Sequence, residues 1–117
     1  MREILFRGKD IKGNWHIGLL AHIGNAWYIS NSAGVSTAFE VIPETVGQFT
    51  GLTDDKDKKI FEGDIVECFS SDYIGHPKIV TITVKNMTDY NTMVYLNCSN
   101  RLVVIGNIHD NPELLKM

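Results

Sequence analysis

The chain has 117 residues, of which 44% are hydrophobic and 21% are charged, the proportions of an ordinary globular domain. Eleven Lys and Arg residues against fourteen Asp and Glu residues give a net charge of −3. This balance excludes a strongly basic nucleic-acid footprint over the whole chain but is compatible with a local basic patch. The length predicts a single domain over residues 1–117.

Short β-branched and aromatic runs, separated by turn residues, recur along the chain without a sustained helical period. These runs predict strands over residues 3–6, 15–20, 26–30, 39–42, 65–69, 78–84, 92–98 and 101–105. Gly24-Asn25 predicts a two-residue type II′ hairpin, because glycine readily adopts the positive φ of the first central position. Val80, Ile82 and Val84 alternate with threonines, and we expect this apolar row to face the core.

Two short helical turns and one charged loop complete the expected organisation. Pro43 suits the first position of a helical turn over 43–46, and Asn111-Pro112-Glu113 is a start signal for a short helix with Asn111 as its N-cap. The charged tract 53–59 is typical of a solvated loop that joins two strands. Together these features predict a mainly β fold of small barrel-like or sandwich-like antiparallel sheets, with one or two short helical turns.

The residues with reactive or metal-binding side chains form no recognisable motif. Cys68 and Cys98 lie in or beside apolar runs without a CxxC spacing, so we expect two free thiols that pack as small hydrophobic groups. The four histidines lack the spacings of a zinc site, and the acidic tract places Lys59 where a calcium loop needs an oxygen ligand. We therefore expect no metal and no cofactor.

Catalytic signatures are also missing from the sequence. No nucleophile elbow, dinucleotide fingerprint or phosphate loop occurs, and we expect the protein not to be an enzyme. No stretch approaches the roughly 20 apolar residues of a membrane span, and the first residues lack the apolar core of a secretory signal. These observations predict a cytoplasmic location with no membrane partner.

A basic and aromatic cluster near the N-terminus is the candidate binding surface. Its members are Arg2, Arg7, Lys9, Lys12 and Trp15, and the cations outnumber the two acids between positions 2 and 12. Such a cluster can stack bases or dock a peptide, whereas the plainer interpretation of Trp15 is core packing. Trp27 and Tyr28 are consecutive, so on a strand they point to opposite faces, and we expect one of them to be exposed.

Three blocks of the chain, taken in their order, form a recognisable pattern. They are Phe6-Arg-Gly-Lys-Asp-Ile-Lys-Gly-Asn-Trp15, Glu40-Val-Ile-Pro-Glu-Thr-Val-Gly-Gln-Phe-Thr-Gly-Leu-Thr-Asp54 continuing into Lys59-Ile-Phe-Glu-Gly-Asp-Ile-Val66, and Ile105-Gly-Asn-Ile-His-Asp-Asn-Pro-Glu-Leu-Leu115. Together they resemble the YopX family of phage and prophage proteins. The resemblance implies a protein encoded by a phage or prophage of bacteria, in a family whose molecular activity is uncharacterised. It supplies no catalytic or ligand-binding residue.

Within these blocks the glycines have the pattern of structural residues. We expect Gly8, Gly51 and Gly63 to form turns. The segment Glu62–Val66 is also similar to an element of small SH3-like barrels, which is a likeness of fold only.

Three hypotheses of function follow from the sequence. The first is a non-enzymatic module that binds a host or phage protein. The second is nucleic-acid binding through the basic and aromatic N-terminal face, with the steep salt dependence of phosphate contacts. The third is a self-assembling structural component, because exposed strand edges favour homo-oligomers.

Overall fold

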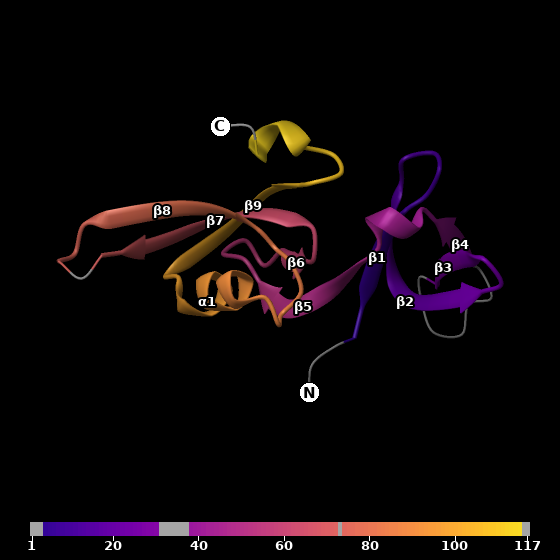
Figure 1. Cartoon of the computed structure of the whole chain (residues 1–117), viewed down its shortest axis with the longest axis horizontal. Coiled ribbons are helices and arrows are strands. Elements are labelled where there is room, and N and C mark those ends of the chain that lie inside the picture. The colour runs from indigo at the N-terminus through magenta and orange to yellow at the C-terminus, as the bar shows by residue number, and fades with distance from the viewer. Residues whose placement is uncertain (1–3, 31–37, 73, 116–117) are drawn as a thin grey trace. The chain divides into compact units, whose positions relative to one another are not determined.

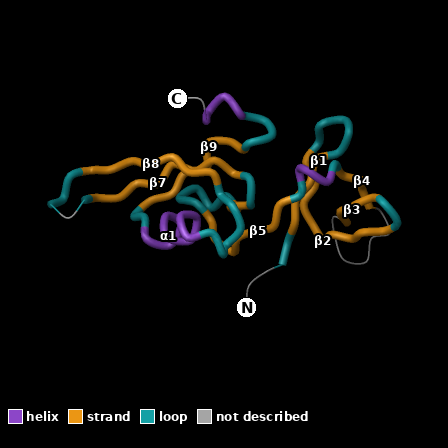
Figure 2. The backbone as a smooth tube through the Cα atoms, viewed as in Figure 1, coloured by secondary structure: helices purple, strands orange, loops and turns teal. Residues whose placement is uncertain are grey.

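A computed structural model describes residues 4–30, 38–72 and 74–115 of the chain, mostly as antiparallel strands (Figures 1 and 2). The strands are β1 (Phe6–Lys9), β2 (Trp15–Ile23), β3 (Ala26–Ser30), β4 (Ala38–Val41), β5 (Gly47–Thr53), β6 (Lys59–Phe61), β7 (Asp64–Ser71), β8 (Pro77–Thr83) and β9 (Arg101–Asn107). The helices are the short η1 (Pro43–Thr45), α1 (Tyr90–Cys98) and η2 (Pro112–Leu115). The mainly β prediction is therefore confirmed.

The chain divides into two compact units, Met1–Phe49 and Thr50–Met117. Their strands form open sheets and no closed barrel within the described residues, so the expectation of a barrel or sandwich describes them only loosely. The prediction of one domain over 1–117, and that of an SH3-like element, stay predictions.

The first unit is a twisted antiparallel sheet in which β4, β3, β2, β1 and the start of β5 follow one another. Its packed face centres on Ile29, which is 0% exposed, and on Val41, which is 3% exposed. Gly8 lies inside β1 and not in the turn that the sequence predicts. A Cβ atom at Gly8 would come within 2.9 Å of the Val41 side chain, so this glycine serves the close approach of two strands.

The second unit contains the sheet β8-β7-β9 and the pairing of β5 with β6. Its core is a cluster of buried side chains from these strands and from α1, namely Ile60, Val66, Cys68, Val84, Leu96 and Leu102. Ile82 packs against this cluster, whereas Ile79 on the other face of β8 is exposed. The predicted orientation of the apolar row of β8 is confirmed.

The predicted first strand, 3–6, overlaps β1 only at Phe6, and β5 and β6 lie outside the predicted strand ranges. One predicted strand is a helix. Residues 92–98 form most of helix α1 and not a strand. The Asp89 carboxylate caps this helix by accepting a hydrogen bond from the Thr92 N–H at 3.0 Å, and Leu96 enters the core. Capping and burial thus outweigh the β propensity of Thr92, Val94 and Tyr95.

Three of the turns share one five-residue design, Asp-x-x-(positive φ)-x. In each, one carboxylate oxygen of the first residue accepts hydrogen bonds from the N–H groups two and four residues later, and the first and fifth residues also pair through their backbones. The turns start at Asp10, Asp54 and Asp72. Their fourth residues, Gly13, Asp57 and Gly75, have φ of +90°, +62° and +90°.

The other predicted turns are largely confirmed. Gly24 has a φ of +63° between β2 and β3, and Gly63 has a φ of +94° in the turn between β6 and β7. Gly51 also has a positive φ, +91°, but it lies inside β5, so the turn predicted at this residue is wrong. Helical turns form at 43–45 and 112–115 as expected. Asn111 directly precedes η2, at the predicted N-cap position, and its Oδ1 accepts a hydrogen bond from the Asn107 N–H at 3.3 Å.

The two cysteines are both free, as expected, but lie in different surroundings. Cys68 is buried in the core of the second unit, and this burial raises the pKa of its thiol. Cys98, at the end of α1, is exposed, so the expectation that it packs as a hydrophobic group is wrong. The buried residues of α1 are Thr92 and Leu96, four positions apart on one face, and Cys98 lies on a different face of the helix.

Candidate functional site

The β1–β2 hairpin brings together most of the residues of the predicted binding surface. Strand pairing places Lys9 opposite Trp15 and Arg7 opposite Ile17. As a result, the Arg7 guanidinium carbon lies 4.9 Å from the centre of the Trp15 ring, and the Lys9 ammonium lies 5.7 Å from it. Both distances are within the range of cation–π attraction.

These residues differ in their exposure. Arg7 is only 8% exposed, and Trp15 and Lys9 are half-buried, whereas Lys12 lies exposed in the turn between the strands. Arg2 lies outside the described residues. The described part of the cluster therefore has a packed centre around Trp15 and an exposed cation, Lys12, at its rim.

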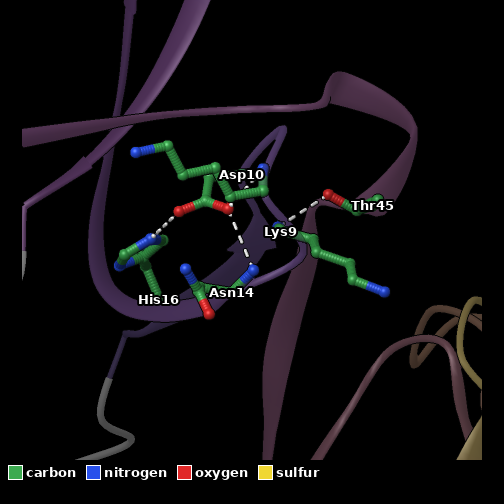
Figure 3. A network of polar contacts seen from close by, with 6 residues as sticks. Lys9, Asp10, Asn14, His16 and Thr45 are labelled. Atoms are coloured by element: carbon green, nitrogen blue, oxygen red, sulfur yellow. Dashed lines mark hydrogen bonds and ion pairs between the residues drawn. The ribbon is translucent and has the colours of Figure 1, made fainter.

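Asp10 organises the turn next to this cluster (Figure 3). Its Oδ1 accepts hydrogen bonds from the backbone N–H groups of Lys12 and Asn14, both at 2.9 Å. Its Oδ2 lies 2.8 Å from Nε2 of His16. The hydrogen bond with His16, followed by the one from Asn14, lowers the pKa of the Asp10 carboxyl.

His16 is itself fixed by a ring contact. Its imidazole stacks on Phe39 of β4 with ring centres 4.0 Å apart and an interplanar angle of 11°. His22, on the same side of β2, stacks on Trp27 at 4.1 Å. The two histidines of this strand thus pack on aromatic rings, His16 half-buried and His22 exposed.

The hairpin is tied to η1 by a short polar chain (Figure 3). The Lys9 N–H donates to Oγ1 of Thr45 at 2.8 Å, and the Thr45 hydroxyl donates to the Ile42 carbonyl at 2.6 Å. The Ile42 N–H in turn donates to the Lys9 carbonyl at 2.8 Å. The loop after β4 is thereby held against the strand that carries Arg7 and Lys9.

A shallow hollow of about 430 Å³ opens beside this turn, and Asp10, Lys12, His16, Phe39 and Glu40 contribute to its walls. Charges of both signs line it, and its one aromatic wall is already stacked on His16. Over the described ranges, no group of three or more His, Cys, Asp or Glu side chains is placed to hold a metal ion.

The opposite face of β2 carries an exposed apolar row. Ile17, Leu19 and Ile23 are 45%, 56% and 66% exposed, and they alternate with the side chains that pack inward. Ala21 continues the row and is also exposed. The strand therefore presents its aliphatic side chains to solvent and the half-buried His16 to the packed face, the reverse of the usual arrangement, while His22 on the same side stays exposed.

Sequence reasoning identifies the cluster at Trp15 but not this row. The signal that points to it is the alternation in β2, where every odd-numbered residue from 15 to 23 is apolar and the even-numbered positions include two histidines. Alternation alone predicts the wrong face of β2 as the buried one, because the sequence does not show that Phe39 and Trp27 stack on the histidines.

Trp27 and Tyr28 point to opposite faces of β3, but both are half-buried, so the expectation that one is exposed is wrong.

The sequence profile described as "YopX protein" matches residues 19–116. This chain belongs to the YopX family. The match begins within β2, so it includes Leu19 and Ile23 of the apolar row but not the cluster of Arg7, Lys9 and Trp15. Comparison with curated proteins finds no similar sequence. None of the helices within the described ranges is long and apolar enough to cross a membrane.

Proposed function

We propose that this YopX-family chain is a phage- or prophage-encoded accessory protein that binds a host or phage protein in the bacterial cytoplasm without catalysing a reaction. The observation that carries the proposal is the apolar row of Ile17, Leu19 and Ile23, which the sheet of the first unit leaves exposed. Monomeric proteins rarely leave such rows uncovered, and contiguous exposed apolar surface favours a protein partner.

The form of this surface favours a protein over a small molecule. A strand face is flat, whereas small ligands are held in concave pockets that cover most of their surface. Fully burying an aliphatic side chain contributes about 1.5–3 kcal/mol, so covering these three half-exposed residues contributes several kcal/mol at most. A free-energy contribution of this size suits a reversible contact. The neighbouring Trp15 and Tyr28 would add to the area that the partner covers.

The test compares substitutions at two residues whose side chains are similarly exposed. Leu19 (56% exposed) lies in the row, and Ile74 (60% exposed) lies in the turn between β7 and β8 of the second unit. Tagged wild-type, L19D and I74D proteins are used to capture partners from cells that carry the phage or prophage, with nuclease present. We expect wild type and I74D to retain the same protein partner and L19D to lose it. Equal capture by all three, or capture of the bait alone, contradicts the proposal.

Nucleic-acid binding is the second candidate, because Arg7 and Lys9 gather at the Trp15 ring and Lys12 is exposed beside them. Such a site predicts affinity for single-stranded DNA or RNA that falls steeply between 50 and 200 mM salt, on the order of the losses known for multiple phosphate contacts. A K12E substitution should weaken that binding further. Absence of a mobility shift at low salt removes this candidate.

A further inference from the structure

The sheet β8-β7-β9 has two outer edges, and one of them is closed by the acidic turn that starts at Asp54. The Leu102 carbonyl accepts a hydrogen bond from the Asp55 N–H at 2.9 Å, and the Val104 N–H donates to Oδ2 of Asp54 at 3.0 Å. Arg101 adds an ion pair, with its Nε 2.6 Å from Oδ2 of Asp55. Outward-facing backbone groups of Leu102 and Val104 in β9 are thus occupied.

Strand β8 forms the other edge, and the hydrogen bonds at its two ends show which of its backbone groups face outward. The Asp72 N–H donates to the His76 carbonyl, and the Val84 N–H donates to the Asp64 carbonyl, so even-numbered residues of β8 bond to β7. Because hydrogen-bonded and non-bonded pairs alternate in an antiparallel ladder, the N–H and C=O groups of Ile79, Thr81 and Thr83 point away from β7.

The open stretch has defined limits. Pro77, at the start of β8, has no N–H to offer, and the outward N–H of Lys85, just beyond the end, donates to Oγ1 of Thr92 in α1 at 3.0 Å. Between these limits residues 79–83 are all β-branched and uncharged. Lysines, bulges and covering loops are the usual protections of an edge strand, and residues 79–83 carry no lysine.

We propose that the β8 edge pairs antiparallel with β8 of a second copy of this chain, so that two three-stranded sheets join into one sheet of six strands. With the twofold axis at Thr81, the three outward-facing residues pair with themselves. Ile79 lies opposite Thr83 of the second copy, and Thr81 lies opposite Thr81. Each of these pairs exchanges two backbone hydrogen bonds.

The side chains at the paired positions are also compatible with this register. The Thr81 pair is a favourable cross-strand contact, and no two like charges stand opposite each other. Pro77 falls opposite Lys85, whose N–H is already bonded to Thr92 within its own chain, so pairing ends without an unsatisfied donor. On the α1 side, Val80 and Ile82 border an open hollow of about 390 Å³, and the Ile82 and Val80 side chains of the second copy would cover them. A neutral, symmetric edge of this kind fits a second copy better than a charged foreign segment.

The test is the mass of the full chain in solution, measured by light scattering and sedimentation over a range of concentrations. We expect wild type to reach twice the chain mass of 13.1 kDa. T81K places two ammonium groups opposite each other, and T81P removes an outward N–H while leaving the bonds to β7 intact. Each should weaken dimerisation at least tenfold, whereas N97K, which adds the same charge to the exposed side of α1, should not.

Amide hydrogen exchange of the wild type provides a residue-specific readout that does not depend on any variant. The N–H groups of Ile79, Thr81 and Thr83 should be protected at high concentration and should exchange faster on dilution. A wild-type chain that stays monomeric at every concentration overturns the proposal. So does a dimer that both T81K and T81P leave intact, or one in which these three amides exchange rapidly.

Discussion

The carboxylate of Asp54 accepts a hydrogen bond from the backbone N–H of Val104, fifty residues further along the chain, at 3.0 Å. Its other oxygen accepts from the N–H groups of Lys56 and Lys58, both at 2.9 Å. Asp54 is only 6% exposed. One side chain therefore closes its own turn and also attaches that turn to β9, in a tract whose composition suggests nothing more than a solvated loop.

Asp54→Asn should lower the free energy of unfolding by about 1–3 kcal/mol at pH 7, because an amide has one acceptor oxygen for three N–H donors. Urea denaturation followed by circular dichroism measures the change. Asp57→Asn, the same substitution in the same turn at an exposed position, is the control and should change stability little, since Asn tolerates a positive φ. Equal effects of the two substitutions would contradict the role of Asp54.

The effect of Asp54 should also depend on pH. Burial raises the pKa of its carboxyl, but the hydrogen bonds from Val104, Lys58 and Lys56 outweigh burial, so the net pKa lies below its ordinary value. A carboxyl with a lowered pKa in the folded state stabilises above its unfolded pKa of about 3.9 and loses this contribution as the pH falls through the folded value. The stability difference between wild type and D54N should accordingly be constant near neutral pH and shrink below about pH 4. A difference that grows on acidification would contradict this assignment.

Because the fourth residue of each of these turns has a positive φ, removing glycine there should lower the stability of the protein, whereas introducing glycine should not. Gly13→Ala should destabilise by about 1 kcal/mol, because its φ of +90° is costly for a residue with a Cβ. Asp57→Gly should be neutral or stabilise by up to about 1 kcal/mol, because Asp57 already occupies that region at +62°. Both changes are measured as shifts in the urea midpoint. If D57G proves as damaging as G13A, the turns do not share one backbone design.

Gly8→Ala should destabilise by about 1–3 kcal/mol, since the added methyl group would lie 2.9 Å from the Val41 side chain. Val41→Ala in the same protein should recover part of this loss by making room, and thermal unfolding of the single and double variants gives the coupling between the positions. Strictly additive effects would mean that Gly8 is not required by the approach of Val41.

His16→Phe should raise the pKa of the Asp10 carboxyl towards its ordinary value, because the hydrogen bond with His16 is the largest cause of its lowering. The phenyl ring retains a surface that can stack on Phe39, so the sheet is preserved. An NMR titration of the Asp10 carboxyl carbon reports the change. His22→Phe, which replaces the histidine stacked on Trp27, should leave the Asp10 pKa unchanged. No rise in H16F, or the same rise in H22F, would show that His16 does not set the Asp10 pKa.

Local signals in the sequence predict the mainly β class and several of the elements, but not β5 or β6. Gly24-Asn25 marks its hairpin, Pro43 and Pro112 mark short helical turns, and the alternation in 78–84 identifies the face of β8 that meets the core. The glycine and proline signals depend on the conformational limits of one residue type, and the alternation depends on the period of a strand. None of these signals requires knowledge of contacts that are distant in the sequence.

Other features depend on partners that are distant in the sequence. Helix α1 forms because Asp89 caps it and Leu96 finds the core, against the β propensity of its residues. The apolar row of β2 faces solvent because Phe39 stacks on His16, from a strand 23 positions later. The cluster at Trp15 is visible in the sequence, but the burial of Arg7 within it is set by strand pairing.

Site-specific photo-crosslinking tests the proposed binding face most directly. A photoreactive phenylalanine analogue is placed at Leu19 or, as the control of matched exposure, at Ile74, and the cells that carry the phage or prophage are irradiated before the protein is isolated. We expect a discrete crosslinked product with another protein from position 19 and none from position 74. Crosslinking of the same partner from position 74 alone, or no product from position 19, would contradict the assignment of the apolar row of β2 as a protein-binding surface.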